Sequence, residues 1–179
     1  MNFQDTQLIG VLARAESTVS SLSDLLGGLV EKFAARGYSL YLVGGSVRDA
    51  LLGRLGNDLD FTTPARPEVV KEILDEWAET VWDTGIDFGT VSAAYKGQQI
   101  EITTFRSDSY DGQSRNPEVV YGDTLEGDLV RRDFKVNAMA IELLADASFT
   151  FHDPLHGLQD VADRVLDTPD KPEISFHDD

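Results

Sequence analysis

The sequence predicts an α+β domain built on a mixed β-sheet of about five strands, with helices packed mainly on one face of the sheet. The length of 179 residues, of which 41% are hydrophobic, is sufficient for one buried core. A long apolar pattern with helical spacing lies near the N-terminus. Short apolar runs separated by glycine and proline follow it and are typical of strands.

The first predicted element is a helix from roughly Val19 to Arg36, because apolar residues recur there at helical spacing and a glycine follows. Residues before Ser20 carry no strong signal. The apolar run from Tyr38 to Val43 predicts a buried strand that leads into a tight turn at Gly44-Gly45. The chain is therefore expected to begin with a helix, a strand and a turn.

A second helix and a second strand are predicted next. Ser46 and Asp49 have the spacing of a capping box, which predicts a helix that begins at Ser46 and ends at Gly53. The alternation of Asp58-Leu59-Asp60-Phe61 predicts a strand with its carboxylates on one face and its apolar side chains on the other.

The rest of the chain is predicted to add two helices, more strands and a long loop. Pro67 to Trp77 and Thr124 to Val130 are expected to be helical. Strands are predicted at Thr80 to Asp83, Thr90 to Tyr95, Gln99 to Phe105, Met139 to Leu144 and Phe149 to Phe151. Lys96-Gly97 is a hairpin turn signal, and residues Arg106 to Gly122 have the polar composition of a long, mobile loop.

The charge restricts the classes of function. The chain has 15 Lys and Arg against 32 Asp and Glu, so its net charge of −17 should repel a bare polyanion. A nucleic-acid enzyme would need cations gathered in its site, a bound metal, or a basic part outside this chain. The absence of cysteine excludes disulfides and thiolate metal sites. No run is long enough to cross a bilayer, so a cytoplasmic protein without a membrane partner is expected.

The turn after the first strand is a candidate phosphate site. Gly44 and Gly45 allow the backbone to approach a ligand closely, and the N–H groups at the start of the next helix, including that of Ser46, favour a phosphate. Arg48 can add a charge-assisted contact. Considered alone, such a glycine pair is more often only a tight connection.

The second strand is a candidate metal site. Asp58 and Asp60 project from one face, and carboxylate oxygens are ligands of Mg²⁺, of which phosphoryl transfer often uses two. A lone D-x-D is usually a solvent-facing strand, but the combination with the glycine turn favours a functional site. Glu101 can offer a third carboxylate if its strand lies beside this one; a charge on an exposed hairpin face is an equal alternative.

A third cluster lies later in the chain. Arg131, Arg132 and Asp133 precede the apolar Phe134, so one guanidinium can point inward towards a triphosphate. Asn137 is four residues after Asp133 and is expected on the same helical face. A helix end with solvated charges is the alternative.

These segments resemble the head of bacterial class II CCA-adding enzymes and poly(A) polymerases. The resemblance spans about Tyr38 to Thr168. Its motifs are Leu42 to Gly53, Asn57 to Phe61, Glu101 to Arg106, Arg131 to Ala140 and the D-P-x-x-G-x-x-D segment from Asp153 to Asp160. It implies a DNA polymerase β-like nucleotidyltransferase fold. It also implies an N-terminal helical segment at 1–37, the head at 38–168 and the start of a linker at 169–179, which leads to a neck and body that the chain lacks.

The resemblance further implies a template-independent tRNA nucleotidyltransferase that adds CCA to tRNA 3′ ends from CTP and ATP by two-metal chemistry. By the same resemblance, Gly45 and Arg48 contact the nucleotide, Asp58 and Asp60 hold Mg²⁺, Arg132 meets the phosphates, and Asp133 and Asn137 shape the pocket. The neck, body and tail that the chain lacks are expected to supply most of the grip on tRNA.

One departure and three alternatives remain. Lys135 replaces the usual threonine of the family. A poly(A) polymerase is the first alternative, although Gly89 to Ala94 lacks the arginine-rich segment that such polymerases resemble here. A specialist that adds only CC or only A is the second. A non-catalytic nucleotide-binding module is the third, and the intact Asp58 and Asp60 argue against it.

Overall fold

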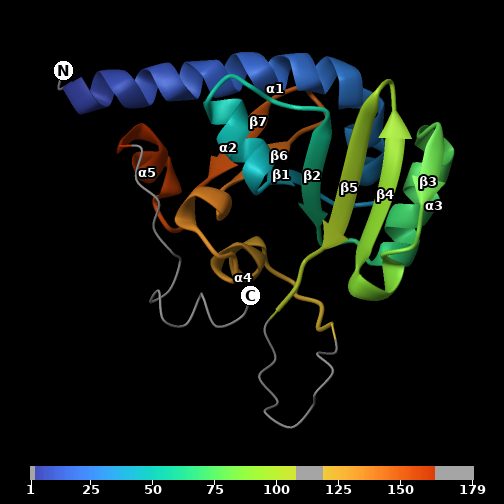
Figure 1. The fold of residues 1–179 in the computed structure, drawn as a ribbon. Coiled ribbons are helices and arrows are strands. Elements are labelled where there is room, and N and C mark those ends of the chain that lie inside the picture. Colours follow the sequence, from blue (N-terminus) through green and yellow to red (C-terminus); the bar gives the residue numbers. More distant parts are fainter. Residues whose placement is uncertain (1–2, 108–118, 164–179) are drawn as a thin grey trace, which may run out of the picture.

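The computed structural model describes residues 3–107 and 119–163 and contains a seven-stranded mixed sheet with helices, which confirms the predicted fold class (Figure 1). The strands are β1 (Leu40–Val43), β2 (Asp58–Thr63), β3 (Thr80–Trp82), β4 (Thr90–Tyr95), β5 (Gln98–Thr104), β6 (Ala140–Leu143) and β7 (Phe149–His152). Their order is β3-β4-β5-β2-β1-β6-β7. The sheet exceeds the expected five strands because the short runs that form β3 and β7 pair at its two edges.

Five α-helices and two 3₁₀ helices accompany the sheet in the described part of the chain. They are α1 (Phe3–Ala35), α2 (Gly45–Leu51), α3 (Pro67–Trp77), α4 (Leu125–Val130), α5 (Gly157–Asp163), η1 (Ile86–Phe88) and η2 (Lys135–Asn137). Helix α3 has the predicted bounds. None of the described helices combines the length and apolar character that a membrane span requires.

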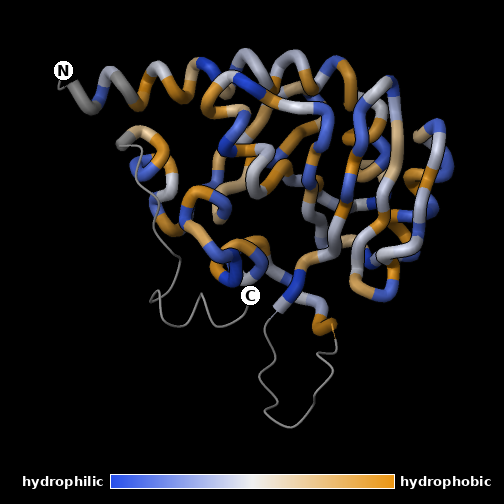
Figure 2. The backbone as a smooth tube through the Cα atoms, viewed as in Figure 1, coloured by the Kyte–Doolittle hydropathy of each residue, from blue (hydrophilic) through white to orange (hydrophobic). Residues whose placement is uncertain are grey.

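Helix α1 begins at Phe3, so the expected start near Val19 is wrong. Val11 and Ala15 are buried and continue the apolar stripe towards the N-terminus. The polar residues Glu16, Ser17 and Thr18 that follow Ala15 weaken this pattern in the sequence, and packing against the rest of the fold supplies the stabilisation that propensity alone does not. Figure 2 shows hydrophobic and hydrophilic residues alternating along α1.

One hydrophobic core joins α1 to the sheet. Leu26 and Phe33 of α1 belong to the same buried cluster as Leu59 and Ile100 of the central strands. Helix α1 also contacts α2, α3 and α5 (Figure 1). Arg14 of α1 donates from Nε to the carbonyl oxygen of Leu51 at 3.4 Å, at the end of α2. The long helix therefore supports the short helix that follows the glycine turn.

The two faces of the central strands differ. Leu59 and Phe61 of β2 are buried in the core that α1 and α3 cover. Asp58 and Asp60 alternate with them and are exposed. Because successive side chains of a strand point to opposite faces, both carboxylates lie on the open face of the sheet. This arrangement confirms the predicted alternation in β2.

Turns and loop ends fix the remaining connections. Lys96 and Gly97 have φ values of 45° and 78°, as a two-residue hairpin turn requires, and they join β4 to β5 as predicted. The predicted loop from Arg106 to Gly122 is described only at its ends, where Arg106 and Tyr121 form an isolated bridge. Residues 108–118 of this loop and the predicted linker at 169–179 lie outside the described residues.

Candidate active site

The glycine turn lies between β1 and α2. Gly44 has φ 65° and ψ −139°, a backbone conformation that is accessible essentially to glycine alone. Gly44 is also the N-cap of α2, so the predicted capping box of Ser46 and Asp49 is wrong. The physical reason is that the helix begins before Ser46, whose side chain turns towards β2 instead.

The hydroxyl group of Ser46 joins this turn to the carboxylate strand. Its Oγ accepts a hydrogen bond from the backbone N–H of Asp60 at 3.0 Å and lies 3.5 Å from the carbonyl oxygen of Asp58. Strand β1 pairs with β2 only at Thr62 and Phe61, so the first residues of β2 have no β1 partner. The buried Ser46 hydroxyl takes the place of that partner and holds the start of β2 against the turn.

The carboxylates of Asp58 and Asp60 lie on the open face of β2, and β5 brings a third acid beside them. The parallel pairing of β2 and β5 aligns Asp60 with Glu101. Glu101 Oε1 lies 3.5 Å from Ser92 Oγ on β4, the strand on the other side of β5 from β2. Within residues 3–107 and 119–163, no three His, Asp or Glu side chains group as a metal site. Glu101 as a third ligand therefore stays a prediction.

Asp60 is the carboxylate with a perturbed environment. Loss of solvent around the carboxyl raises the pKa of Asp60 from its ordinary value, Arg132 opposes this shift, and Asp58 adds to it. Two neighbouring carboxylates that repel each other are stabilised by a cation between them. Oxygen donors on one exposed face also match the ligand preference of a hard divalent cation.

Two arginines approach the glycine turn. A Cβ atom built on Gly44 would lie 3.3 Å from Arg132 Nη1, and one built on Gly45 would lie 3.2 Å from Arg48 Nη2. The absence of side chains on the two glycines therefore leaves room for both guanidinium groups. Arg48 is held further by Nη1, which donates to Asn137 Oδ1 at 3.4 Å. The structure thus brings predicted site residues from α2, η2 and the end of α4 together at one turn.

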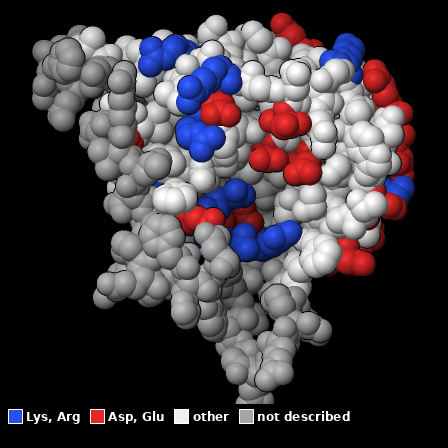
Figure 3. All heavy atoms as spheres, in the orientation of Figure 1, with Lys and Arg blue, Asp and Glu red and all other residues white. Residues whose placement is uncertain are grey.

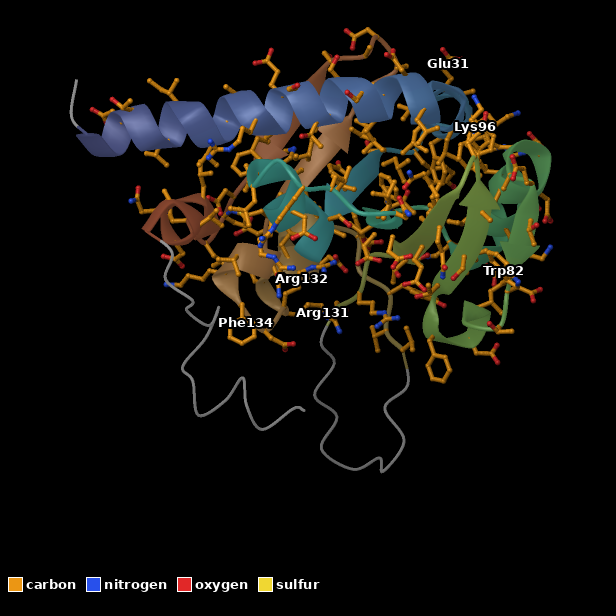
Figure 4. The ribbon with its side chains drawn as sticks, turned by 45° about the horizontal axis from the view of Figure 1, so that its top comes forward. Glu31, Trp82, Lys96, Arg131, Arg132 and Phe134 are labelled. Atoms are coloured by element: carbon orange, nitrogen blue, oxygen red, sulfur yellow. The ribbon has the colours of Figure 1, made fainter. Side chains whose placement is uncertain are left out.

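Arg132 is held by Asp128, a residue that the sequence analysis did not identify. Asp128 is 2% exposed, and its Oδ2 accepts from Arg132 Nη2 at 3.1 Å. In Figure 4, Arg132 and the adjacent Arg131 lie close together near the middle of the molecule, away from Trp82 at its edge. The spacing of four residues between an acid and an arginine was the available sequence signal.

The segment after α4 differs from the prediction. Helix α4 ends at Val130, and Phe134 is extended, with φ −127° and ψ 143°. Asp133 and Asn137 therefore do not share a helical face, and that expectation is wrong. Asn137 reaches Arg48, whereas Asp133 is exposed, and no hydrogen bond or ion pair joins it to another predicted site residue in the described part of the chain.

The D-P-x-x-G-x-x-D segment packs against η2, the short helix next to the site. The carboxylate of Asp153 accepts from the N–H groups of Gly157 at 2.7 Å and Leu158 at 2.9 Å, at the start of α5. A Cβ atom on Gly157 would lie 2.1 Å from the carbonyl oxygen of Lys135. Only glycine at this position permits the close contact between α5 and η2. This contact matters for the site because η2 carries Asn137.

The charge distribution resolves the conflict between a net charge of −17 and an anionic ligand. Figure 3 shows basic side chains gathered over α2 and α4, next to acidic side chains over β2 and β5. The acidic side chains lie where a bound cation could offset their negative charge. Arg48 and Arg132 lie beside the glycine turn. The turn therefore has cationic groups beside it although the net charge of the chain is strongly negative.

The mixed sheet, the paired carboxylates of β2 and the glycine turn with its arginines define the nucleotidyltransferase class of head domains. Residues 40–167 match the family described as the poly A polymerase head domain, and the chain belongs to this family.

Curated relatives and solved structures agree with this family. The chain is 40% identical over 152 residues to a CCA-adding enzyme of Listeria monocytogenes and 42% identical over 144 residues to one of Lactobacillus helveticus. These matches cover 84% and 80% of this chain but 37% and 34% of the relatives. The chain therefore spans little more than a third of their length.

Two solved structures show the same fold. A Bacillus stearothermophilus CCA-adding enzyme in complex with CTP superimposes with a TM-score of 0.72 at 36% identity, over 88% of this chain and 36% of the other. A Thermotoga maritima CCA-adding enzyme complexed with tRNA_CCA gives a TM-score of 0.68 at 28% identity, over 89% and 35%. The similarity therefore includes nearly all of this chain.

Proposed function

We propose that this chain is the catalytic head of a template-independent tRNA nucleotidyltransferase that adds CCA to tRNA 3′ ends, with CTP and ATP as substrates. The observation that carries the proposal is the meeting of Arg48 and Arg132 at the Gly44-Gly45 turn, which Ser46 ties to the strand of Asp58 and Asp60. A turn with two guanidinium groups suits a triphosphate, and adjacent carboxylates suit its metal.

Each group has a role in the proposed reaction, in which an RNA 3′-hydroxyl attacks the α-phosphate of the nucleotide and pyrophosphate leaves. The Gly44-Gly45 turn brings backbone N–H groups close to the triphosphate. Arg48 and Arg132 offset its charge and orient it, and Asn137 holds Arg48 in place. Positioning and electrostatics then provide most of the rate enhancement.

Asp58 and Asp60 are the residues that would hold Mg²⁺, and their exposed, mutually repelling carboxylates fit that ion. Glu101, aligned with Asp60, is the proposed third carboxylate. When bound, the metal would lower the pKa of the attacking hydroxyl and offset charge on the leaving group. The two carboxylates would hold such an ion on the open face of the sheet.

The proposal also assigns a role to each segment of the chain. The head would extend from residue 38 to 168, after an N-terminal helical segment at 1–37, and the segment at 169–179 would begin the linker to a neck and body. Asp133 would line the nucleotide pocket from the exposed side. Grip on tRNA would come largely from the part of the relatives that this chain does not cover. A cytoplasmic location, where tRNA is processed, belongs to the same proposal.

The experiment compares two proteins: this chain, and this chain joined to the C-terminal part of the Listeria monocytogenes relative. Each is incubated with Mg²⁺, labelled CTP or ATP, and a tRNA that lacks its 3′ end, and the products are resolved on a sequencing gel. Ordered addition of C, C and A by the joined protein is the expected result. Nucleotide binding by the short chain, with little or no addition, is expected because most of the RNA grip is missing.

Other outcomes would identify the alternatives. Long runs of A would indicate a poly(A) polymerase, and addition of only C or only A would indicate a specialist. Nucleotide binding without any addition by either protein would indicate a non-catalytic module. The Asp58→Asn, Asp60→Asn variant of the joined protein is the control, and full activity in this variant would contradict the assigned site.

A further inference from the structure

Asp128 is the one buried charged residue in the described part of the chain. Its side chain is 2% exposed, whereas the acids that pair with Lys32, Arg36, Arg48, Arg66, Lys71 and His152 are at least 20% exposed. Burial of a carboxylate is costly unless its oxygens have hydrogen-bonded or charged partners. The position of this residue therefore requires an explanation from the groups that surround it.

Both carboxylate oxygens of Asp128 are used, and they connect two different segments. Oδ2 accepts from Arg132 Nη2 at 3.1 Å, and Oδ1 accepts from the backbone N–H of Arg106 at 2.9 Å. Arg106 follows β5, the strand that carries Glu101, and Arg132 follows α4. Asp128 thus connects the segment after β5 to Arg132, the arginine at the Gly44 turn.

The direction of the Arg132 side chain depends on this contact. Asp128 holds Nη2, while Nη1 of the same guanidinium lies 3.3 Å from a Cβ atom built on Gly44. Because the guanidinium is planar and rigid, a bond at Nη2 restricts the positions that Nη1 can occupy. Asp60 of β2 also interacts electrostatically with Arg132, so loss of Asp128 would leave Arg132 free to shift towards the carboxylates of β2.

Arginine side chains near Asp128 repel one another, so the position of the Asp128 carboxylate matters. Burial lowers the pKa of the Arg106 guanidinium from its ordinary value, Arg131 and Arg132 lower it further, and Asp128 opposes them. The guanidinium groups of Arg131 and Arg132 therefore repel that of Arg106, and the Asp128 carboxylate is an acid that offsets this repulsion. Removal of that carboxylate would leave their repulsion without its internal counter-charge.

We propose that Asp128 is a positioning residue that holds the Arg132 guanidinium at the Gly44 turn, away from Asp58 and Asp60, so that the triphosphate and its metal bind side by side. The inference rests on the proposed function, because it assigns to Arg132 a triphosphate as ligand. Asp128 itself contacts neither substrate nor metal. It acts through Arg132, and this dependence distinguishes it from a residue that only stabilises the fold.

The test is a double-mutant cycle on the affinity for CTP in the presence of Mg²⁺, measured by calorimetry with this chain. The four proteins are the wild type, Asp128→Asn, Arg132→Ala and the double variant. Asp128→Asn should weaken binding about tenfold in the wild-type background, the loss expected for one charged hydrogen bond. In the Arg132→Ala background the same change should weaken it less than about twofold, because the group that Asp128 orients is gone.

The matched control is Asp75→Asn. Asp75 forms an ion pair with Lys71 at the same spacing of four residues, but on exposed positions of α3. This control should leave the CTP affinity within about twofold of wild type, since exposed pairs contribute little. If Asp128→Asn does not fold, Asp128→Glu keeps the charge, displaces the carboxylate and completes the cycle. An equal loss in both backgrounds would overturn the proposal, because Asp128 would then act independently of Arg132.

A second measurement does not require a nucleotide. NMR spectra of the Arg132 guanidinium, assigned by the loss of its signals in Arg132→Lys, should show separate Nη protons in the wild type because the ion pair hinders rotation. Averaged signals are expected in Asp128→Asn, and unchanged signals would contradict the proposal. Absence of CTP binding by the wild type would count against the proposed function alone, and the NMR comparison would still test the role of Asp128.

Discussion

The two charged regions of the site are built in different ways. The acidic region consists of Asp58 and Asp60 on β2, with Glu101 aligned beside them on β5. All three are exposed, and strand alternation together with the pairing of β2 and β5 places them on one face. The basic region contains Arg132, which comes from a different part of the chain and is held by the buried Asp128.

Substitutions in the two regions are therefore expected to have different effects on ligand binding and on folding. The exposed acids repel one another and do not contribute to the core, so their removal should affect ligand binding far more than folding. Arg132 serves both purposes, because it faces the glycine turn and also neutralises a buried carboxylate. Substitution in the basic region should therefore change folding and binding together.

The largest expected effect is on the proposed nucleotide addition. Asp58→Asn, Asp60→Asn in the joined protein should lower nucleotide addition at least about a thousandfold, because several kcal/mol of charge stabilisation would be lost. The free energy of unfolding should change by less than about 1 kcal/mol, since two exposed like charges are removed. Gel-based rates and urea unfolding measure the two effects. Asp24→Asn, Asp75→Asn removes the same charge elsewhere and should leave the rate unchanged.

The next largest effect is expected at Arg132. Arg132→Ala leaves the buried Asp128 carboxylate without its ion pair, so the free energy of unfolding should fall by about 3 kcal/mol. The affinity for CTP should fall as well. Arg36→Ala, which breaks exposed pairs with Glu72 and Glu76, should cost less than about 1 kcal/mol. Equal losses in the two variants would show that the buried ion pair contributes no more to the free energy of unfolding than the exposed ones.

A smaller effect is expected at the turn between the two regions. Gly44→Ala places a side chain on a residue with φ 65° and ψ −139° and should lower the free energy of unfolding by about 2 kcal/mol. The new Cβ atom would also lie against Arg132, so CTP binding should weaken. Gly27→Ala in α1, where a Cβ atom meets nothing within 4 Å, should instead raise stability by about 1 kcal/mol. Chemical denaturation of both variants tests this contrast.

The smallest effect is expected at Ser46. Ser46→Ala leaves the backbone N–H of Asp60 without its hydroxyl partner and should cost about 1 kcal/mol. Because this bond sets the start of β2, the affinity for Mg²⁺ should fall more than the affinity for CTP without metal. Ser21→Ala removes an exposed hydroxyl of α1 and should change stability by less than about 0.5 kcal/mol. A greater loss at Ser21 would contradict the role assigned to Ser46.

Much of the site could be predicted because short-range patterns determine it. The i, i+2 spacing of Asp58 and Asp60 and the bounds of α3 needed only local rules. Asp128 was missed, because nothing in the residues near it indicates burial, and the arginine N–H groups that permit it come from separate segments. The capping box failed at Ser46 for a related reason, since β2 offered its hydroxyl a better partner.

The sequence by itself determined the order of the elements, the alternation of β2 and the glycine turn, because each depends on the backbone preferences of a few adjacent residues. Only the tertiary structure decided the full length of α1, the joining of all seven predicted strands in one sheet and the separation of α4 from η2. It also decided which arginines face the turn. These features depend on contacts between distant segments, whose free energies exceed the weak local preferences of the residues involved.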